Sequence, residues 1–355
     1  MTNFSKNELG GLDIPNRFNS PLDIDVKDSK SLENFLKRMI LIRKVEHHIA
    51  LSRKNGLIRG PVHLGAGQEA IAVGVSKHLY STDRVFGAHR SHAHLLALNP
   101  DYYMLFAEVL GKTTGFSKGM GGSMHLWDKP SGFYGSVPIV SGTVPLAVGA
   151  AMAAKMQNSS DIAVVYIGDG AMEEGVVHEA LNLARIQNAP VIFVVENNLF
   201  ASHMHISLRQ PSNLTSRFAK ANHIPYKLVD GNNVIEVSNA AKKLIEISRS
   251  GDSPTFLELV TYRWYGHVDW RDDVDVGVER SLDDIDNWKA RDPILRLSTA
   301  MIDSKIWSQD KEQSFMDDLD NKINNAWEKA MNDPYPNKSS ILTSVYSCNF
   351  DSEKK

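Results

Sequence analysis

The stretch Ile162-Ala-Val-Val-Tyr-Ile-Gly-Asp-Gly170, followed 26 residues later by Asn197-Asn198, decides how this chain folds. An apolar run of strand length ends in a Gly-Asp-Gly turn, and a second apolar run, 190–195, precedes the asparagine pair. Parallel strands bind ligands at their carboxyl edge, so Asp169 and Asn198 are expected at the same edge. Carboxylate and amide oxygens suit Mg²⁺, and a helix N-terminus after the turn suits phosphate.

Strands and helices alternate through the middle of the chain. The pattern predicts strands over 162–167, 191–195, 226–229 and 255–261, and helices over 144–156, 172–187 and 234–249. This alternation predicts an α/β fold with a mainly parallel sheet that helices cover on both faces.

Further helices are expected before and after this region. One is predicted to begin with Ser31 as its N-cap, another to run over 65–75, and the charged segment after Ser281 is predicted to be helical, with two tryptophans as packing anchors, Trp288 and Trp327. We expect a loosely attached N-terminal arm over 1–27, one α/β domain over 28–345 and a C-terminal tail over 346–355.

Composition restricts the class of protein. The chain has 355 residues and a formal net charge of −3, and its basic residues are dispersed, which argues against binding to nucleic acid or an anionic membrane. Cys348 is the single cysteine and lies in the tail, so neither a disulfide framework nor a cysteine nucleophile is expected. Acidic residues near the N-terminus and the lack of a long apolar run favour a cytoplasmic protein without a membrane span.

The Gly-Asp-Gly turn with its distant Asn-Asn pair resembles the thiamin-diphosphate motif. The resemblance extends from about Phe35 to about Leu297 and is to the alpha subunit of the first component of 2-oxo acid dehydrogenase complexes, of the pyruvate or acetoin type. It implies a thiamin-diphosphate-binding fold. It also implies that Mg²⁺ is held by Asp169, Asn198 and the backbone carbonyl of Phe200, while two backbone N–H groups reach the diphosphate, those of Gly170 and Ala171.

Several other motifs match this family. In His89-Arg90-Ser-His the arginine matches the family residue that grips the diphosphate. His89 replaces the usual tyrosine and is still expected among the cofactor-binding residues, as a donor to a phosphate oxygen. His125, in Gly-Gly-Ser-Met-His, resembles a histidine that handles the substrate or the lipoyl arm, and His63 resembles one that lines the site. His267, after the last predicted strand, resembles the histidine that touches the diphosphate and assists proton or acyl transfer.

The segment Pro138-Ile-Val140 resembles the part of the family that holds the cofactor bent. Val140 would be the apolar wedge, and Pro138 would contact the aminopyrimidine. A bent cofactor brings its imino nitrogen near the thiazolium carbon, so the proton transfer becomes intramolecular. Residues 268–273 differ from the serine-bearing loop of animal pyruvate dehydrogenases, so phosphorylation directly after His267 is not expected.

Each of these residues also has an ordinary structural interpretation. Asp169 could be a turn residue that caps a helix, Arg90 a solvated loop residue and Val140 a core residue. A histidine in a glycine-rich loop, such as His125, is commonly a surface residue, and His63 could be a satisfied structural one. For Asp169 the paired Asn198 favours the metal-ligand interpretation, whereas for Val140 sequence alone does not separate the two.

The resemblance also implies partners. The family's cofactor-activating glutamate comes from a beta subunit, and neither Glu69 nor Glu173 matches it here. We therefore expect an alpha–beta interface at the site, an alpha2–beta2 heterotetramer and a lipoyl-bearing acyltransferase as acceptor, with the chain inactive alone. The expected reaction is oxidative decarboxylation of a small 2-oxo acid, or cleavage of acetoin, with acyl transfer to a lipoyl domain.

The sequence is compatible with two alternative functions. One is a thiamin-diphosphate-dependent carboligase or transketolase-like enzyme, for which His89 and the unusual 268–273 loop leave room. The other is a noncatalytic α/β scaffold that only binds a partner. A nicotinamide dehydrogenase is less well supported, because the turn at 168–173 lacks the third glycine of the dinucleotide fingerprint.

Overall fold

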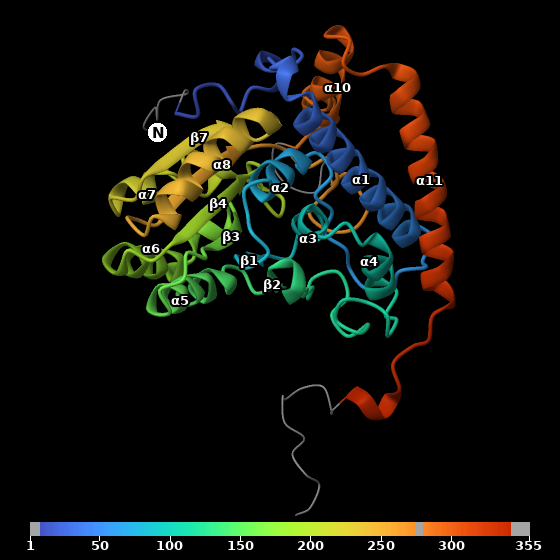
Figure 1. The fold of residues 1–355 in the computed structure, drawn as a ribbon, viewed down its shortest axis with the longest axis horizontal. Helices are drawn as coiled ribbons and strands as arrows, with labels where there is room; N and C mark the ends of the chain where they lie inside the picture. Colours follow the sequence, from blue (N-terminus) through green and yellow to red (C-terminus); the bar gives the residue numbers. More distant parts are fainter. Residues whose placement is uncertain (1–7, 274–279, 342–355) are drawn as a thin grey trace, which may run out of the picture.

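The computed structural model describes residues 8–273 and 280–341, which contain a six-stranded parallel sheet in the order β2-β1-β3-β4-β8-β7 (Figure 1). The strands are β1 (Arg84–Gly87), β2 (Phe133–Ser136), β3 (Ala163–Gly168), β4 (Val191–Asn197), β7 (Tyr226–Asp230) and β8 (Thr255–Val260). A separate short hairpin joins β5 (Phe200–Ala201) to β6 (Met204–His205). The predicted α/β fold with a parallel sheet is therefore confirmed.

Helices surround this sheet. They are α1 (Ser29–Lys54), α2 (Glu69–Ser76), α3 (His92–Leu98), α4 (Tyr102–Val109), α5 (Thr143–Met156), α6 (Gly175–Gln187), α7 (Arg217–Ala221), α8 (Val234–Arg249), α9 (Leu282–Lys289), α10 (Pro293–Asp303) and α11 (Gln309–Asn332). Figure 1 shows the long α11 lying beside α1 and α4, away from the sheet. The helical C-terminal segment was predicted, and its Trp288 and Trp327 are buried as expected.

The sheet has an apolar core on each face. Val164 and Tyr166 of β3 join the core cluster that includes α1, α2 and α8, whereas Val165 and Ile167 join the cluster under α5 and α6. Successive strand side chains point to opposite faces, so a strand buried on both sides reads as the continuous apolar run seen in the sequence.

Three helix boundaries differ from the prediction. α1 begins at Ser29 because a 3₁₀ turn, Val26–Asp28, runs directly into it, so Ser31 lies inside the helix and is not its N-cap. α2 begins only at Glu69, because Gly67 has a φ of +99° that a helix does not allow. The helix expected over 172–187 is divided by extended Glu174 into a 3₁₀ turn, Ala171–Glu173, and α6.

A single buried carboxylate organises part of the glycine-rich segment between α4 and β2. Glu108 is fully buried, and its two oxygens accept four backbone N–H groups at 2.7–3.0 Å, those of Ser117, Gly119, Gly121 and Gly122. Gly119 has a φ of +76°, and a Cβ there would lie 2.5 Å from the backbone carbon of Gly111. The loop is thus a specific structure built around one side chain.

Residues 8–27, the described part of the expected N-terminal arm, pack against the rest of the chain. Leu9 packs in the cluster that contains Phe200 and Trp288, and Leu22 packs in the core cluster that includes α1. Both side chains are buried, because they cover apolar surface that would otherwise face water. Cys348 and the expected tail at 346–355 lie outside the described residues.

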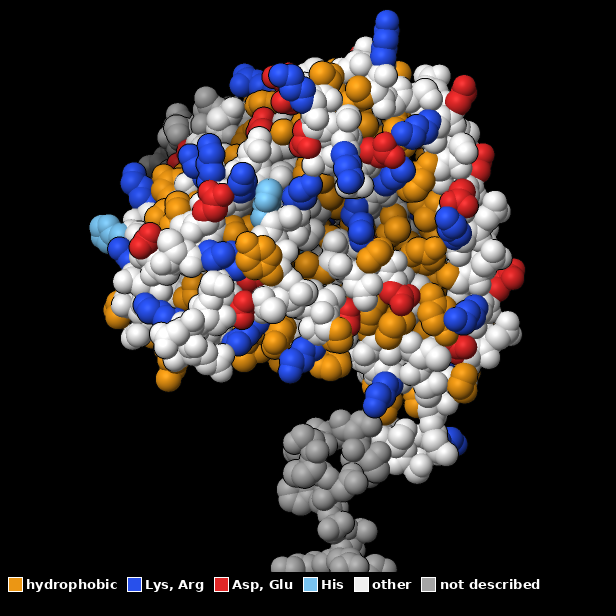
Figure 2. Space-filling view, viewed as in Figure 1, with side chains coloured by type: hydrophobic (Ala, Val, Ile, Leu, Met, Phe, Trp, Pro, Cys, Tyr) orange, Lys and Arg blue, Asp and Glu red, His pale blue; other side chains and the backbone are white. Residues whose placement is uncertain are grey.

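The surface agrees with the dispersed charge of the sequence. On the face drawn in Figure 2, acidic and basic side chains are interspersed and neither sign dominates. Within the two described ranges, no helix combines the length and the apolar character that crossing a membrane requires.

Candidate active site

The candidate site lies where four neighbouring strands end. His89 and Arg90 follow β1, Asp169 follows β3, Asn198 follows β4, and His267 follows β8. These strands are adjacent in the sheet, so their carboxyl ends bring the five side chains to one cavity of about 340 Å³. The predicted residues that line it are His89, Arg90, Val140, Asp169, Gly170, Ala171, Asn198, Phe200 and His267.

The remaining predicted residues lie outside the lining of this cavity. His63 is buried and touches the rings of His89 and His267 from behind. Pro138 is half-buried, two residues from the lining residue Val140. His125 is exposed, and its carbonyl accepts a hydrogen bond from the Ser117 hydroxyl at 2.6 Å. In this chain by itself, therefore, His125 is not brought to the cavity.

Asp169 is buried and has a basic partner that the sequence did not reveal. Its carboxylate pairs with Arg209, whose guanidinium also pairs with Glu173, and its backbone carbonyl accepts from Gln210 at 3.1 Å. Burial raises the pKa of the Asp169 carboxyl, and the positive charge of Arg209 opposes that effect. Asp169 is thus a buried carboxylate paired with a cation. A residue that only forms a turn needs neither burial nor a cationic partner.

The Asn198 amide is oriented by two hydrogen bonds. Its nitrogen donates to Gln68 Oε1 at 3.1 Å, and its oxygen accepts from the Phe200 backbone N–H at 3.2 Å. These bonds assign the two ends of the amide, so the oxygen lies on the side of the 198–200 turn. Asn198 and Phe200 both line the cavity that Asp169 lines.

Positive charge is concentrated on one side of the cavity, where Arg90 lines the wall and Arg263 and Arg280 lie near it. Arg90, Arg263 and Arg280 are all buried and donate to backbone carbonyl groups. Burial, followed by the charges of the other two guanidinium groups, lowers the pKa of Arg263. Three N–H groups have no partner among the described residues, namely Arg263 Nε, Arg280 Nε and Arg280 Nη1. Such an excess of buried donors and positive charge suits an anionic ligand.

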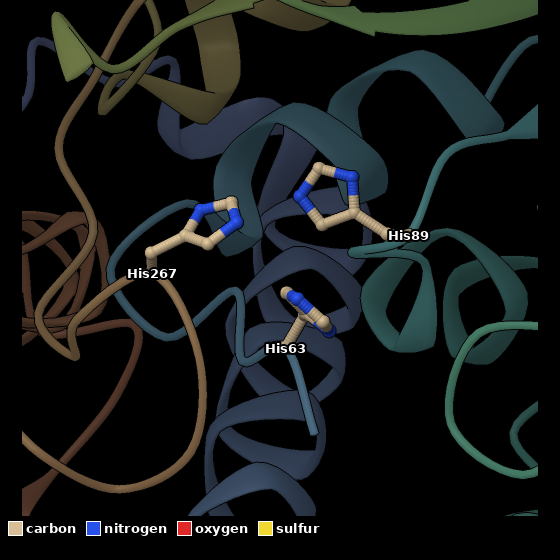
Figure 3. Close-up of side chains that lie close together, drawn as sticks. All are labelled: His63, His89 and His267. Atoms are coloured by element: carbon tan, nitrogen blue, oxygen red, sulfur yellow. The ribbon is translucent and has the colours of Figure 1, made fainter. Parts of the chain in front are cut away.

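Three histidine rings meet at the base of this wall (Figure 3). The ring centroids are 4.7 Å apart for His63 and His89, 5.3 Å for His63 and His267, and 5.3 Å for His89 and His267. Burial, followed by the charge of Arg90, lowers the pKa to about 3 in His63, about 2 in His89 and about 4 in His267. All three imidazoles are therefore neutral at pH 7.

These lowered pKa values predict that the chain loses stability in mild acid. Above the unfolded pKa of 6.5 the rings are neutral in both states, whereas below it only the unfolded chain takes up the protons. The free energy of unfolding should fall as the pH drops from 7.5 to 5.5, with a slope of at most about 1.4 kcal/mol per pH unit for each ring below pH 6.5.

Denaturant unfolding at several pH values measures this slope. His89→Phe removes one titrating ring and should make the slope shallower, whereas His125→Ala removes an exposed ring and should leave it unchanged. Equal slopes in wild type and His89→Phe would contradict the assignment of depressed pKa values to this cluster.

The loop after His267 is held by its own acidic residues. Asp269 pairs with Arg53 at 2.9 Å and accepts the Val62 backbone N–H at 3.2 Å, and Asp273 accepts the His267 backbone N–H at 2.7 Å. Asp269 therefore fastens the loop to the segment that carries His63, and Asp273 bonds the loop back to His267. Residues 274–279 lie outside the described part of the chain.

Several residues of this site carry no signal in the sequence. Arg209 and Gln210 come from the segment after the β5–β6 hairpin, and Glu196, which lines the cavity, is bonded to His94 Nε2 at 3.1 Å. No motif marks these positions, because their contacts come from residues far away in the sequence. Glu69, considered in the sequence as an acid near the motifs, is paired with Arg43.

Comparison with known proteins gives an independent result. The family model for the dehydrogenase E1 component matches residues 37–339. The alpha subunit of acetoin:2,6-dichlorophenolindophenol oxidoreductase from Bacillus subtilis is 34% identical over 328 residues, which cover 91% of this chain and 95% of that protein. The pyruvate dehydrogenase E1 component subunit alpha is 34% identical over 311 residues in Rhizobium meliloti (87% and 88%) and 31% identical over 331 residues in Rickettsia felis (91% and 100%).

Proposed function

Because the chain belongs to the dehydrogenase E1 component family, we propose that it is the alpha subunit of a thiamin-diphosphate-dependent dehydrogenase for a small 2-oxo acid or acetoin. The observation that carries the proposal is the meeting of Asp169, Asn198 and Phe200 at one cavity, at the carboxyl ends of adjacent strands. The chain is about equally similar to pyruvate and acetoin enzymes. The proposal therefore includes both substrate classes.

The residues of the cavity fit a magnesium-bound diphosphate. Asp169, Asn198 and the Phe200 carbonyl supply hard oxygen ligands for Mg²⁺, and the backbone N–H groups of Gly170 and Ala171 would face phosphate oxygens. A Cβ at position 170 would lie 2.5 Å from the Ala201 side chain, so glycine is required where the turn approaches the hairpin. The buried arginines, with donors that lack partners, add the positive charge that a diphosphate needs.

When bound, thiamin diphosphate supplies a carbon nucleophile and an electron sink next to it. Arg90 would bind the diphosphate, since it lines the cavity and its side chain is already fixed by the carbonyls of Leu64 and His267. Val140 lines the cavity with about half of its surface exposed and would support the bent cofactor. His267, with a neutral ring, can accept or return a proton near the reacting atoms.

The overall reaction we propose is an oxidative acyl transfer. In a 2-oxo acid, the bond between the carbonyl carbon and the carboxylate breaks and carbon dioxide leaves. The two electrons left on the acyl carbon reduce the disulfide of a lipoyl group, so that one sulfur becomes the acyl thioester and the other a thiol. With acetoin, the carbon–carbon bond between its two oxygen-bearing carbons breaks instead, and acetaldehyde leaves. His63 and His125 are proposed to serve the substrate or the lipoyl arm.

The proposed enzyme includes a beta subunit in an alpha2–beta2 heterotetramer. The two acidic residues near the motifs are already used within the chain, since Glu69 pairs with Arg43 and Glu173 with Arg209. The cofactor-activating glutamate would therefore come from the partner. Ile139 and Val140 expose 71% and 51% of their surfaces beside the cavity, which suits a protein interface there. Within the heterotetramer we propose a single domain over 28–345, with an arm before it and a tail after it.

Reconstitution with the cognate beta subunit tests the function. The pair should reduce 2,6-dichlorophenolindophenol, the acceptor in the name of the Bacillus subtilis relative, with pyruvate or acetoin only when thiamin diphosphate and Mg²⁺ are present. Addition of a lipoyl domain should yield its acylated, reduced form, detected by mass spectrometry. A pair that binds no cofactor in calorimetry would overturn the proposal, and a pair that joins the substrate only to aldehydes would make it a carboligase.

Arg209 gives a prediction about the metal site. If Mg²⁺ binds the Asp169 carboxylate, it must compete with the guanidinium that pairs there now. Arg209→Met leaves Asp169 buried without a cation, which should destabilise the cofactor-free protein by about 3–5 kcal/mol. Mg²⁺ with thiamin diphosphate should then raise the unfolding temperature more in this variant than in wild type, as differential scanning fluorimetry of the pair would detect.

The control for this experiment is Arg217→Met. Arg217 bonds Gln210 and two backbone carbonyls rather than Asp169. Its replacement should leave the increase caused by cofactor close to the wild-type value. An increase in Arg209→Met that is equal to or smaller than that of wild type would show that Arg209 and Mg²⁺ do not share the carboxylate.

A further inference from the structure

His63, His89 and His267 form a cluster in which the three rings lie close together, which histidines with separate structural roles would not require. One ring nitrogen from each of His63, His89 and His267 lies within 4.8 Å of the other two. Figure 3 shows the rings arranged around a common space, each from a different segment of the chain. His63 Nδ1 is buried and has no hydrogen-bond partner among the described residues.

The spacing of the rings suits a tetrahedral metal ion. Zn²⁺ binds histidine nitrogen at about 2.0–2.1 Å, which sets ring centroids roughly 5 Å apart in a tetrahedral site. The observed separations of 4.7, 5.3 and 5.3 Å bracket that value. The nitrogens, which lie within 4.8 Å of one another, must close to roughly 3.4 Å when the ion binds, so the rings must turn toward it.

Arg90 explains why the three rings come together. Its guanidinium donates to the carbonyl of Leu64, the residue after His63, at 2.6 Å, and to the carbonyl of His267 at 3.0 Å. Because Arg90 itself follows His89, one side chain fastens all three histidine-bearing segments. The cost is the positive charge of Arg90 and Arg263 near the cluster, which the neighbouring carboxylates of Asp269 and Asp273 partly balance.

We propose that His63, His89 and His267 form an open tri-histidine site that binds Zn²⁺, separate from the Mg²⁺ ligands Asp169, Asn198 and Phe200. The ligands are neutral imidazoles, which suit Zn²⁺ and not the harder Mg²⁺. Three protein ligands leave a fourth position of the ion open toward the cavity that His89 and His267 line. His89 completes the site in this chain. With the tyrosine that the family usually has at this position, only two imidazoles would remain.

Isothermal titration calorimetry of the full chain, without a polyhistidine tag, tests the site with Zn²⁺ alone. One Zn²⁺ should bind per chain, and Mg²⁺ at the same concentration should give no heat from this site. His89→Phe keeps a ring of similar size but should weaken Zn²⁺ binding by more than about 100-fold, since even outer partners of metal ligands are worth roughly 10–100-fold. His125→Ala, which removes an exposed histidine, should retain wild-type affinity.

Zinc anomalous scattering from a soaked crystal locates the ion independently of any variant. A peak among the three rings supports the site, and a peak elsewhere, or none, overturns it. Unchanged Zn²⁺ affinity in a folded His89→Phe chain, verified by circular dichroism, overturns it as well. If His89→Phe does not fold, the anomalous peak alone decides.

The site has a consequence that rests on the proposed function. Zn²⁺ on the cavity wall should compete with thiamin diphosphate, so the cofactor should weaken Zn²⁺ binding to the alpha–beta pair in the presence of Mg²⁺. Zn²⁺ binding without any thiamin diphosphate binding would refute the proposed function and leave the metal site standing. Thiamin diphosphate binding without Zn²⁺ binding would refute the metal site alone.

Discussion

Asp169→Asn is expected to abolish Mg²⁺-dependent binding of thiamin diphosphate to the alpha–beta pair, with a loss of affinity of at least about 100-fold, since a direct ligand contributes more than its outer partners. The substitution keeps the shape of the side chain but removes the negative charge that would face both the metal and Arg209. Asp169 is buried, so water cannot take over the missing ligand charge. Calorimetry with cofactor and Mg²⁺ measures the loss, and dehydrogenase activity should fall with it.

Asp161→Asn is the matched control for this prediction. Asp161 precedes β3, so it lies at the opposite end of the strand that Asp169 follows. It is half-buried, and a hydrogen bond with the Thr82 side chain lowers the pKa of its carboxyl. Its replacement should leave cofactor affinity unchanged. Wild-type affinity in Asp169→Asn would mean that this carboxylate does not bind the metal, and the proposed function would lose its main support.

Glu108→Gln should produce a large loss of folding stability for a conservative change, because Glu108 orders the segment between α4 and β2. The carboxylate accepts four backbone N–H groups, whereas glutamine has one acceptor oxygen and turns an NH₂ group toward two of those donors. Hydrogen bonds to a charged acceptor contribute about 1.5–3 kcal/mol each, and buried donors without partners cost more. We expect the free energy of unfolding to fall by about 3–5 kcal/mol.

Urea unfolding followed by circular dichroism measures this change, and limited proteolysis reports on the loop itself. Cleavage within 115–125 should become faster in Glu108→Gln, because the four bonds that order this segment are lost. Glu328→Gln is the control, since Glu328 is exposed on α11. A change below about 0.5 kcal/mol in Glu108→Gln, the size typical of surface substitutions, would contradict the role of this carboxylate.

Much of the fold could be predicted because its signals are local. Apolar runs such as 162–167 report strands buried on both faces, and their regular alternation with helices indicates a parallel sheet. Residues directly after such strands, Asp169 and Asn198 among them, must lie at the carboxyl edge. Their meeting at one cavity was therefore predictable without knowledge of any contact.

The boundaries that were wrong depend on contacts beyond the local pattern. The start of α2 was placed too early because Gly67 adopts a positive φ against the backbone carbonyl of Tyr262, which is distant in the sequence. The break before α6 occurs where Glu173 pairs with Arg209 and where Ser141 donates to the Ala171 carbonyl at 2.7 Å. The spacing of apolar residues that predicts a helix contains no information about either contact.

The parallel α/β architecture and the strand ends that carry the site can be read from the amino-acid sequence, because burial periodicity and turn residues act over a few neighbouring positions. Tertiary structure alone decided which charges and rings meet there: Arg209 on Asp169, four N–H groups on Glu108, and three imidazoles gathered by Arg90. These contacts join residues tens to hundreds of positions apart, or fold a loop back on one side chain, so no local pattern encodes them.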